Sequence, residues 1–159
     1  MQILVDADSC PRAAREMILR FSSRLGIKSV FAANHPIPGL DENQKLKQTA
    51  FFELCPPGEG AADRRILELA KNGDLVITRD LPLAEQLVDA GVSVLDDRGR
   101  AFTKENIREC RSIRDFTVGL ADSGLDFDRT PSYGKKELSS LANSLDRELS
   151  RLNRATVGV

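Results

Sequence analysis

The sequence predicts an α/β fold, a three-layer sandwich with a mostly parallel five-stranded sheet. Three observations lead to this class. Short, nearly all-apolar segments alternate with longer segments that have the periodicity of amphipathic helices, and Gly, Pro, Asn or Asp separates them. Strands that are apolar on both faces are typical of parallel sheets covered by helices on both sides.

The five predicted strands are short, apolar and rich in β-branched or aromatic residues. They cover residues 2–6, 28–34, 49–54, 74–78 and 92–96. The segments between them give the order β-α-β-β-α-β-α-β, which places most strands parallel.

The helices are predicted from apolar spacing and from residues that start or stop a helix. A helix in 9–26 has Ser9 as its expected N-cap and Gly26 as its stop. Further helices are expected in 61–73 and in 79–91, the latter started by Asp80 with Pro82 in its first turn.

After the last strand, Thr103 is expected to cap a helix that covers much of 104–121. A final helix over 137–153 has leucines at spacings of three and four, so its apolar face should dock on the chain or pair with a second copy as a homodimer. Loops are expected over 40–48 and 122–136. We predict a single domain over 1–159, on which the C-terminal helices of 103–155 pack.

The composition is that of a globular protein, with 41% hydrophobic and 30% charged residues and a net charge of −1. No apolar run approaches the roughly 20 residues of a membrane span, and the N-terminus has no basic region followed by an apolar stretch. We therefore expect a cytoplasmic protein with no membrane partner.

Cysteine and histidine are too sparse for several common kinds of site. Cys10, Cys55 and Cys110 are far apart and form no CxxC pair, which argues against a disulfide framework or a structural zinc site. His35 is the single histidine and lies in a Pro-Gly turn. Carboxylates are therefore the main candidates for a functional site.

Acidic residues follow the carboxyl ends of several predicted strands, where ligands bind in open parallel sheets. The first strand leads to Asp6 and Asp8, the fourth to Thr78 and Asp80, and the fifth to Asp96 and Asp97, while Asp63 lies in the first turn of a helix. Taken singly, Asp8, Asp63 and Asp80 have ordinary explanations as helix caps or as charges near a helix N-terminus. Asp6 has no such capping role.

Converging carboxylates repel one another, and a divalent cation removes that penalty. An all-oxygen ligand set suits Mg²⁺ or Mn²⁺, which can activate water and neutralise charge on a phosphate. Phosphodiester hydrolysis is the leading chemistry. A rival is the haloacid-dehalogenase type of phosphatase, in which the first aspartate of "DADS" would be the nucleophile; here Gly73-Asp74 precedes a strand, whereas those enzymes place it after one.

Four segments, in order over nearly the whole chain, resemble the YaiI/YqxD family of bacterial proteins. They are "DADSCP", "GAADRRILELAKNGDLVITRDLPLAEQLVDAG", "DRGRAFTKENI" and "LANSLDREL". That family is in turn similar to the PIN-like nuclease superfamily, whose members have a parallel sheet between helices and an acidic cluster that binds Mg²⁺ or Mn²⁺ and cleaves RNA.

The resemblance implies catalytic and metal-binding roles for Asp6, Asp63 and Asp80, and a fourth acid at Asp96 or Asp97. Asp8 stays a further candidate metal ligand. Thr78 would orient a ligand carboxylate by a hydrogen bond. The family has proline where this chain has Asp97, which argues against Asp97.

The expected substrate contacts are Arg98, Arg100 and Asn106, with Asn34 as another candidate, because these residues lie near the predicted strand ends and could hold phosphates. Arg79 is expected to pair with a nearby carboxylate instead. The phenylalanines and Tyr133 form no evident stacking surface for bases. A metal-dependent ribonuclease is therefore the leading hypothesis, and a catalytically weak nucleic-acid or protein binding module and an aspartyl-phosphate phosphatase stay open.

Overall fold

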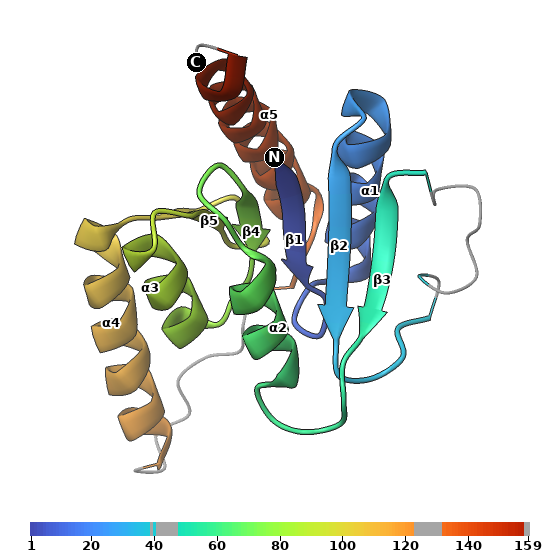
Figure 1. The fold of residues 1–159 in the computed structure, drawn as a ribbon. Helices are drawn as coiled ribbons and strands as arrows, with labels where there is room; N and C mark the ends of the chain where they lie inside the picture. Colours follow the sequence, from blue (N-terminus) through green and yellow to red (C-terminus); the bar gives the residue numbers. More distant parts are fainter. Residues whose placement is uncertain (39, 41–47, 123–131, 158–159) are drawn as a thin grey trace.

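The computed structural model describes residues 1–38, 40, 48–122 and 132–157, and the side chains of all of these except 114–122. Within these ranges six strands form one sheet in the order β3-β2-β1-β4-β5-β6 (Figure 1). The strands are β1 (Gln2–Asp6), β2 (Lys28–Ala33), β3 (Ala50–Leu54), β4 (Leu75–Ile77), β5 (Ser93–Leu95) and β6 (Ala101–Phe102). Strands β1 to β5 are parallel, and β6 is antiparallel to β5.

The mostly parallel α/β sheet was predicted, but the predicted number of five strands was wrong. The sixth strand, β6, is only two residues long and turns back along β5 after a tight turn. Two residues are too few for an alternation of apolar and polar side chains to be recognised, so this strand had no signal in the sequence.

In the described part of the chain, five helices flank the sheet: α1 (Arg12–Leu25), α2 (Ala61–Leu69), α3 (Leu81–Asp89), α4 (Lys104–Asp122) and α5 (Lys135–Val157). Helices α1 and α5 share one apolar cluster with side chains of the strands. Helices α2 and α3 and the start of α4 share a second cluster with the alternate strand residues (Figure 1). The sheet is therefore covered on both faces, as its apolar strands require.

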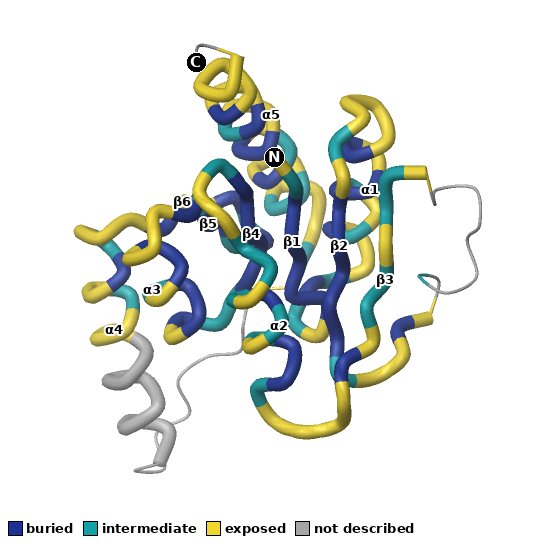
Figure 2. The backbone as a smooth tube through the Cα atoms, in the orientation of Figure 1, coloured by how far each residue is buried: buried dark blue, intermediate teal, exposed yellow. Residues whose placement is uncertain are grey.

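The central strands are the most buried part of the chain (Figure 2). Adjacent residues of β1 point to opposite faces, so Ile3 and Val5 enter one cluster and Leu4 enters the other. Strand β3 lies at the edge of the sheet, and Phe51 and Leu54 are exposed there.

The leucine stripe of α5 is buried within the same chain. Leu141, Leu145, Leu149 and Leu152 all join the cluster that α1 and the sheet form. The docking alternative therefore holds, and this stripe is not open to a second copy. No helix in the described ranges is long and apolar enough to cross a membrane.

The helix starts agree with the sequence in two cases and differ in one. Asp80 caps α3 by accepting a hydrogen bond from the Leu83 amide at 2.8 Å, and Thr103 caps α4. The Ser9 cap was wrong, because α1 begins after Pro11 without a side-chain cap. The expected loops over 40–48 and 122–136 lie largely outside the described residues.

Strand order reverses between β1 and β4, since the chain first builds β2 and β3 on one side of β1 and then β4 to β6 on the other. In open α/β sheets this reversal leaves a crevice beyond the carboxyl ends of the strands. Asp6 ends β1, and Asp80 follows β4, so the two residues stand on either side of this point.

Candidate functional site

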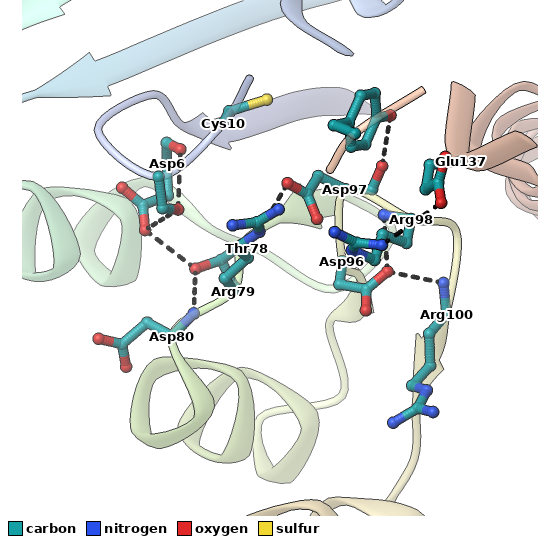
Figure 3. A network of polar contacts seen from close by, with 12 residues as sticks. Asp6, Cys10, Thr78, Arg79, Asp80, Asp96, Asp97, Arg98, Arg100 and Glu137 are labelled. Carbon is teal, nitrogen blue, oxygen red and sulfur yellow. Dashed lines mark hydrogen bonds and ion pairs between the residues drawn. The ribbon is translucent and has the colours of Figure 1, made fainter. Parts of the chain in front are cut away.

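Asp6 is the acidic residue most firmly built into the sheet. It is the last residue of β1 and is only 6% exposed. Its Oδ2 accepts hydrogen bonds from the hydroxyls of Thr78 and Ser9, each at 3.1 Å (Figure 3). Burial raises the pKa of Asp6, and these two hydrogen bonds offset part of that rise. The serine expected to cap a helix therefore holds a carboxylate instead.

Thr78 connects Asp6 to the start of α3. It is buried directly after β4, and its amide donates to the Leu95 carbonyl at 3.0 Å. Its hydroxyl donates to Asp6 and accepts from the Asp80 amide at 3.0 Å. The hydrogen bond to a carboxylate expected for Thr78 is thus present, and it fixes the positions of both aspartates.

Asp63 lies close to Asp6 and Asp80, although it comes from the first turn of α2. Its pKa is raised to about 6, first by burial and then by the negative charges of Asp80 and Asp6, with the Asp80 side chain within hydrogen-bonding reach. We call Asp6, Asp63 and Asp80 the acidic cluster. After burial, the strongest influences on the pKa of Asp63 are therefore negative charges from the same cluster.

The acidic cluster does not form a closed set of direct metal ligands. Among the residues that the structure describes, no three His, Cys, Asp or Glu side chains converge closely enough to hold one ion. The donor chemistry nevertheless fits a hydrated Mg²⁺, which keeps several waters and needs only one or two carboxylates. Asp6 accepts both side-chain hydrogen bonds at Oδ2 and Asp80 caps α3 through Oδ1, so each presents a second oxygen.

Asp8 points to a different partner. Its Oδ1 lies 2.8 Å from His35 Nδ1, and its Oδ2 accepts from the Asn34 amide at 3.1 Å. His35 Nδ1 also lies 3.1 Å from Asn34 Oδ1. Asp8 is near enough for its charge to raise the pKa of Asp6 and Asp63, but its oxygens hold the turn after β2.

Asp96 and Asp97 both serve the turn between β5 and β6. Asp96 Oδ1 accepts from the amides of Arg98 and Arg100 at 2.9 and 2.8 Å, which shapes the turn. Asp97 is 2% exposed and forms an ion pair with Arg79, whose Nε lies 2.6 Å from Oδ2. The expected pairing of Arg79 with a carboxylate is therefore present.

The three expected phosphate contacts lie in different settings. Arg98 and Arg100 belong to the β5–β6 turn and line a cavity beside the acidic cluster. Arg98 Nη1 lies 3.7 Å from Glu137 Oε1, and Arg100 Nη1 donates to Cys110 Sγ at 3.4 Å.

The two asparagine candidates do not line this cavity. Asn106 exchanges hydrogen bonds with Thr103 at the start of α4 and donates to the Ala101 carbonyl. Asn34 donates to the Gly58 carbonyl.

Residues of the C-terminal segment hold the turn between β5 and β6, residues 96–100, which we call the arginine turn because it carries Arg98 and Arg100. No sequence pattern indicated this contact. Ser144 donates to the Gly99 carbonyl and Tyr133 to the Asp97 carbonyl, both at 2.6 Å. Gly99 has φ of +85°, and a Cβ there would lie 2.5 Å from the Ser140 carbonyl oxygen. These partners are 36 to 45 residues apart in sequence, so no local pattern could identify them.

One cavity of about 640 Å³ joins these features. Its acidic end is lined by Asp6, Ser9 and Asp80. Its other end is lined by residues of the arginine turn, of β6 and of α4, namely Arg98, Arg100, Phe102, Cys110 and Ile113. Figure 3 shows Arg79 and Asp96 between the two ends. The cavity thus places carboxylates and guanidinium groups along one continuous surface.

Comparisons with known proteins agree with the resemblance read from the sequence. The family model described as "Uncharacterized BCR, YaiI/YqxD family" matches residues 4–151. UPF0178 proteins of Treponema pallidum and Myxococcus xanthus are each 42% identical over 154 residues, which cover 97% and 96% of this chain and 84% and 96% of the relatives. A UPF0178 protein of Vibrio cholerae is 37% identical over 153 residues, covering 95% of this chain and 98% of the relative. No solved structure gave a significant match.

Proposed function

The chain belongs to the YaiI/YqxD family, and from the chemistry of its site we propose that it is a cytoplasmic ribonuclease that uses Mg²⁺ or Mn²⁺ to hydrolyse phosphodiester bonds. We further propose that its fold is a three-layer sandwich of the PIN-like type. The proposal concerns this chain alone, because the names of its relatives state no activity.

The acidic cluster is the observation that carries the proposal. Three carboxylates from β1, α2 and the start of α3 face one another across the point where strand order reverses, and burial together with the charges of Asp80 and Asp6 raises the pKa of Asp63 to about 6. A purely structural role would supply such carboxylates with donors or counter-charges. Asp63 instead faces the negative charges of Asp80 and Asp6, which a divalent cation would offset.

When bound, the divalent cation would supply a water of lowered pKa and would neutralise charge on the phosphate. Asp6 and Asp80 would hold it, directly or through water, with the oxygens that Thr78, Ser9 and the helix amide leave open. Asp63 faces the same cluster from α2 and would be placed to accept a proton from water there. Thr78 would hold Asp6 and Asp80 in fixed positions relative to each other through its two hydrogen bonds.

The arginine turn would bind the substrate's phosphates. Arg98 and Arg100 line the same cavity as Asp6 and Asp80, so a polynucleotide whose scissile phosphate meets the cluster would pass these side chains. Guanidinium groups bind phosphate oxygens in a two-pronged geometry and carry their charge at all relevant pH values. Because phosphate contacts do not read bases, this half of the site predicts no sequence preference.

The structure gives less support to the phosphatase alternative. An aspartyl-phosphate mechanism would use Asp6 as nucleophile and Asp8 as general acid, but the carboxylate of Asp8 is engaged by His35 and the Asn34 amide. A general acid must present its proton to the leaving group. Asp8 would have to leave both partners to do so.

The test is cleavage of single-stranded and structured RNA by the purified protein with Mn²⁺ or Mg²⁺, repeated with a chelator. Asp6→Asn and Asp80→Asn should abolish cleavage, whereas Asp146→Asn, which removes an exposed carboxylate of α5, should not. Cleavage that survives both site substitutions would contradict the proposal. A phosphorylated Asp6 trapped from a small phosphate ester would favour the phosphatase, and RNA binding without turnover would favour the binding module.

A further inference from the structure

The cavity beside the acidic cluster has an apolar wall that phosphate binding does not explain. We propose that this wall is a binding site for one unpaired nucleobase of the substrate, an assignment that rests on the proposed ribonuclease function. The site lies between the arginine turn and the first three turns of α4, and we call it the base site, lined by Leu81, Arg100, Phe102, Cys110 and Ile113.

The apolar character of the base site comes from three separate elements. Leu81 begins α3, Phe102 ends β6, and Ile113 lies on α4. Leu81 and Phe102 are nearly buried and belong to the core, so they form a firm wall. Ile113 differs, because 58% of its surface is exposed although it lines the cavity. A flat apolar ligand would remove this side chain from water.

Arg100 gives the base site its positive side. Its amide donates to Asp96 Oδ1 at 2.8 Å (Figure 3). Its guanidinium donates to Cys110 Sγ at 3.4 Å, so the side chain lies toward α4. The residue is exposed and forms no ion pair within the described part of the chain. A planar guanidinium over an apolar wall can stack on a base and can also contact the adjacent phosphate.

Size and continuity favour a nucleobase over other ligands. The volume of about 640 Å³ lies within the range of small-molecule sites, roughly 300–1,000 Å³, and exceeds what a phosphate group alone would fill. The same cavity reaches Asp6 and Asp80, so one nucleotide strand can occupy both ends. A base in a duplex is stacked and paired and cannot enter a pocket without being extruded. The base site therefore predicts a preference for single-stranded RNA.

The test compares adenosine 5′-monophosphate with ribose 5-phosphate, which share the phosphate and differ in the base. Calorimetry with the whole protein should give about tenfold tighter binding of the nucleotide, since stacking of one base contributes on this order. Ile113→Ser should remove most of that advantage, and Leu25→Ser, a matched change of an exposed leucine on α1, should keep it. Arg100→Gln should weaken both ligands, and Arg108→Gln, on an exposed part of α4 outside the cavity, should weaken neither.

Two results would overturn the base site: equal affinity of the wild-type protein for both ligands, or an unchanged preference for the nucleotide in Ile113→Ser. Neither ligand contains a phosphodiester bond, so the measurement does not depend on nuclease activity. Preference for the nucleotide without any RNA cleavage would contradict the ribonuclease and leave the base site standing. RNA cleavage without a preference for the nucleotide would contradict the base site and leave the ribonuclease proposal standing.

Discussion

Two nearly buried aspartates stand at opposite ends of the same pair of strands and have opposite surroundings. Asp74, 5% exposed, lies just before β4 and accepts hydrogen bonds from the amide and the side chain of Gln2 and from the Lys71 amide, at 3.0 to 3.1 Å. Asp6, at the other end of β1, accepts only two hydroxyl hydrogen bonds and faces two further carboxylates.

The difference separates a structural carboxylate from one suited to bind a cation. Asp74 ties the start of β1 to the loop before β4, and its charge is met by three N–H donors. Asp6 is buried at a cost that its hydrogen bonds only partly offset, so its charged form is disfavoured, and the cation that we propose would offset the rest of that cost. Burial alone therefore does not identify a functional aspartate. The number of hydrogen-bond donors that surround the buried carboxylate is the more informative feature.

The largest expected effect is the loss of cleavage in Asp6→Asn. Removal of a metal-binding carboxylate should lower RNA cleavage about a hundredfold or more, because stabilisation of several kcal/mol in the transition state is lost. The free energy of unfolding should not fall, since the asparagine oxygen can accept the same two hydroxyls. Kinetics and denaturant unfolding measured together check this, and a marked loss of stability would place Asp6 in the same class as Asp74.

Asp74→Asn should show the opposite behaviour. The new amide nitrogen would face at least one N–H donor and leave it without an acceptor, which should lower the free energy of unfolding by about 2–3 kcal/mol. Cleavage by the folded fraction should be unchanged. Asp146→Asn is the matched control for the loss of one carboxylate charge. Normal stability of Asp74→Asn would show that its three hydrogen bonds contribute little.

A smaller effect is expected from Thr78→Val, which keeps the shape of the side chain and removes the hydroxyl. Asp6 would lose one donor and the Asp80 amide its acceptor, so cleavage should fall roughly tenfold, as with other groups that orient metal-binding side chains. Thr78→Ser should restore most of the activity. If Thr78→Val were fully active at every metal concentration, the link between the two aspartates would have no positioning role.

Much of the fold could be predicted because the signals are local. The five parallel strands were located to within about two residues, since each is a short and largely apolar run followed by residues that signal a turn or a helix start. The proximity of Asp6 and Asp80 also followed from the sequence, because parallel strands bring their carboxyl ends to one edge. Two-residue β6 had no such signal.

What could not be predicted depends on contacts between distant residues. Ser9 has the sequence of a helix cap, but α1 begins after Pro11, and the Ser9 hydroxyl instead shares Asp6 Oδ2 with Thr78, which follows the neighbouring strand. The apolar wall formed by Phe102 and Ile113 is another case, because their spacing fits an ordinary core pattern. Sequence patterns predict helices, strands and the residues at their ends. The hydrogen-bond donors around a carboxylate and the side chains that line a cavity depend on the tertiary structure.

The smallest predicted effect sharpens the comparison further, because Asp63→Asn should stabilise the protein. With its pKa raised from 3.8 to about 6, the folded state holds the Asp63 proton more tightly than the unfolded state, so this group favours folding at low pH. That contribution is lost as the pH rises through about 6. The variant should therefore exceed the wild-type free energy of unfolding by about 1 kcal/mol at pH 8 without metal, after allowance for solvent screening. The difference should vanish near pH 4, and denaturant unfolding at both pH values measures it. A destabilised variant at pH 8 would mean that favourable contacts stabilise the charged form of Asp63, as they do for Asp74. The acidic cluster would then need no cation to offset its charge.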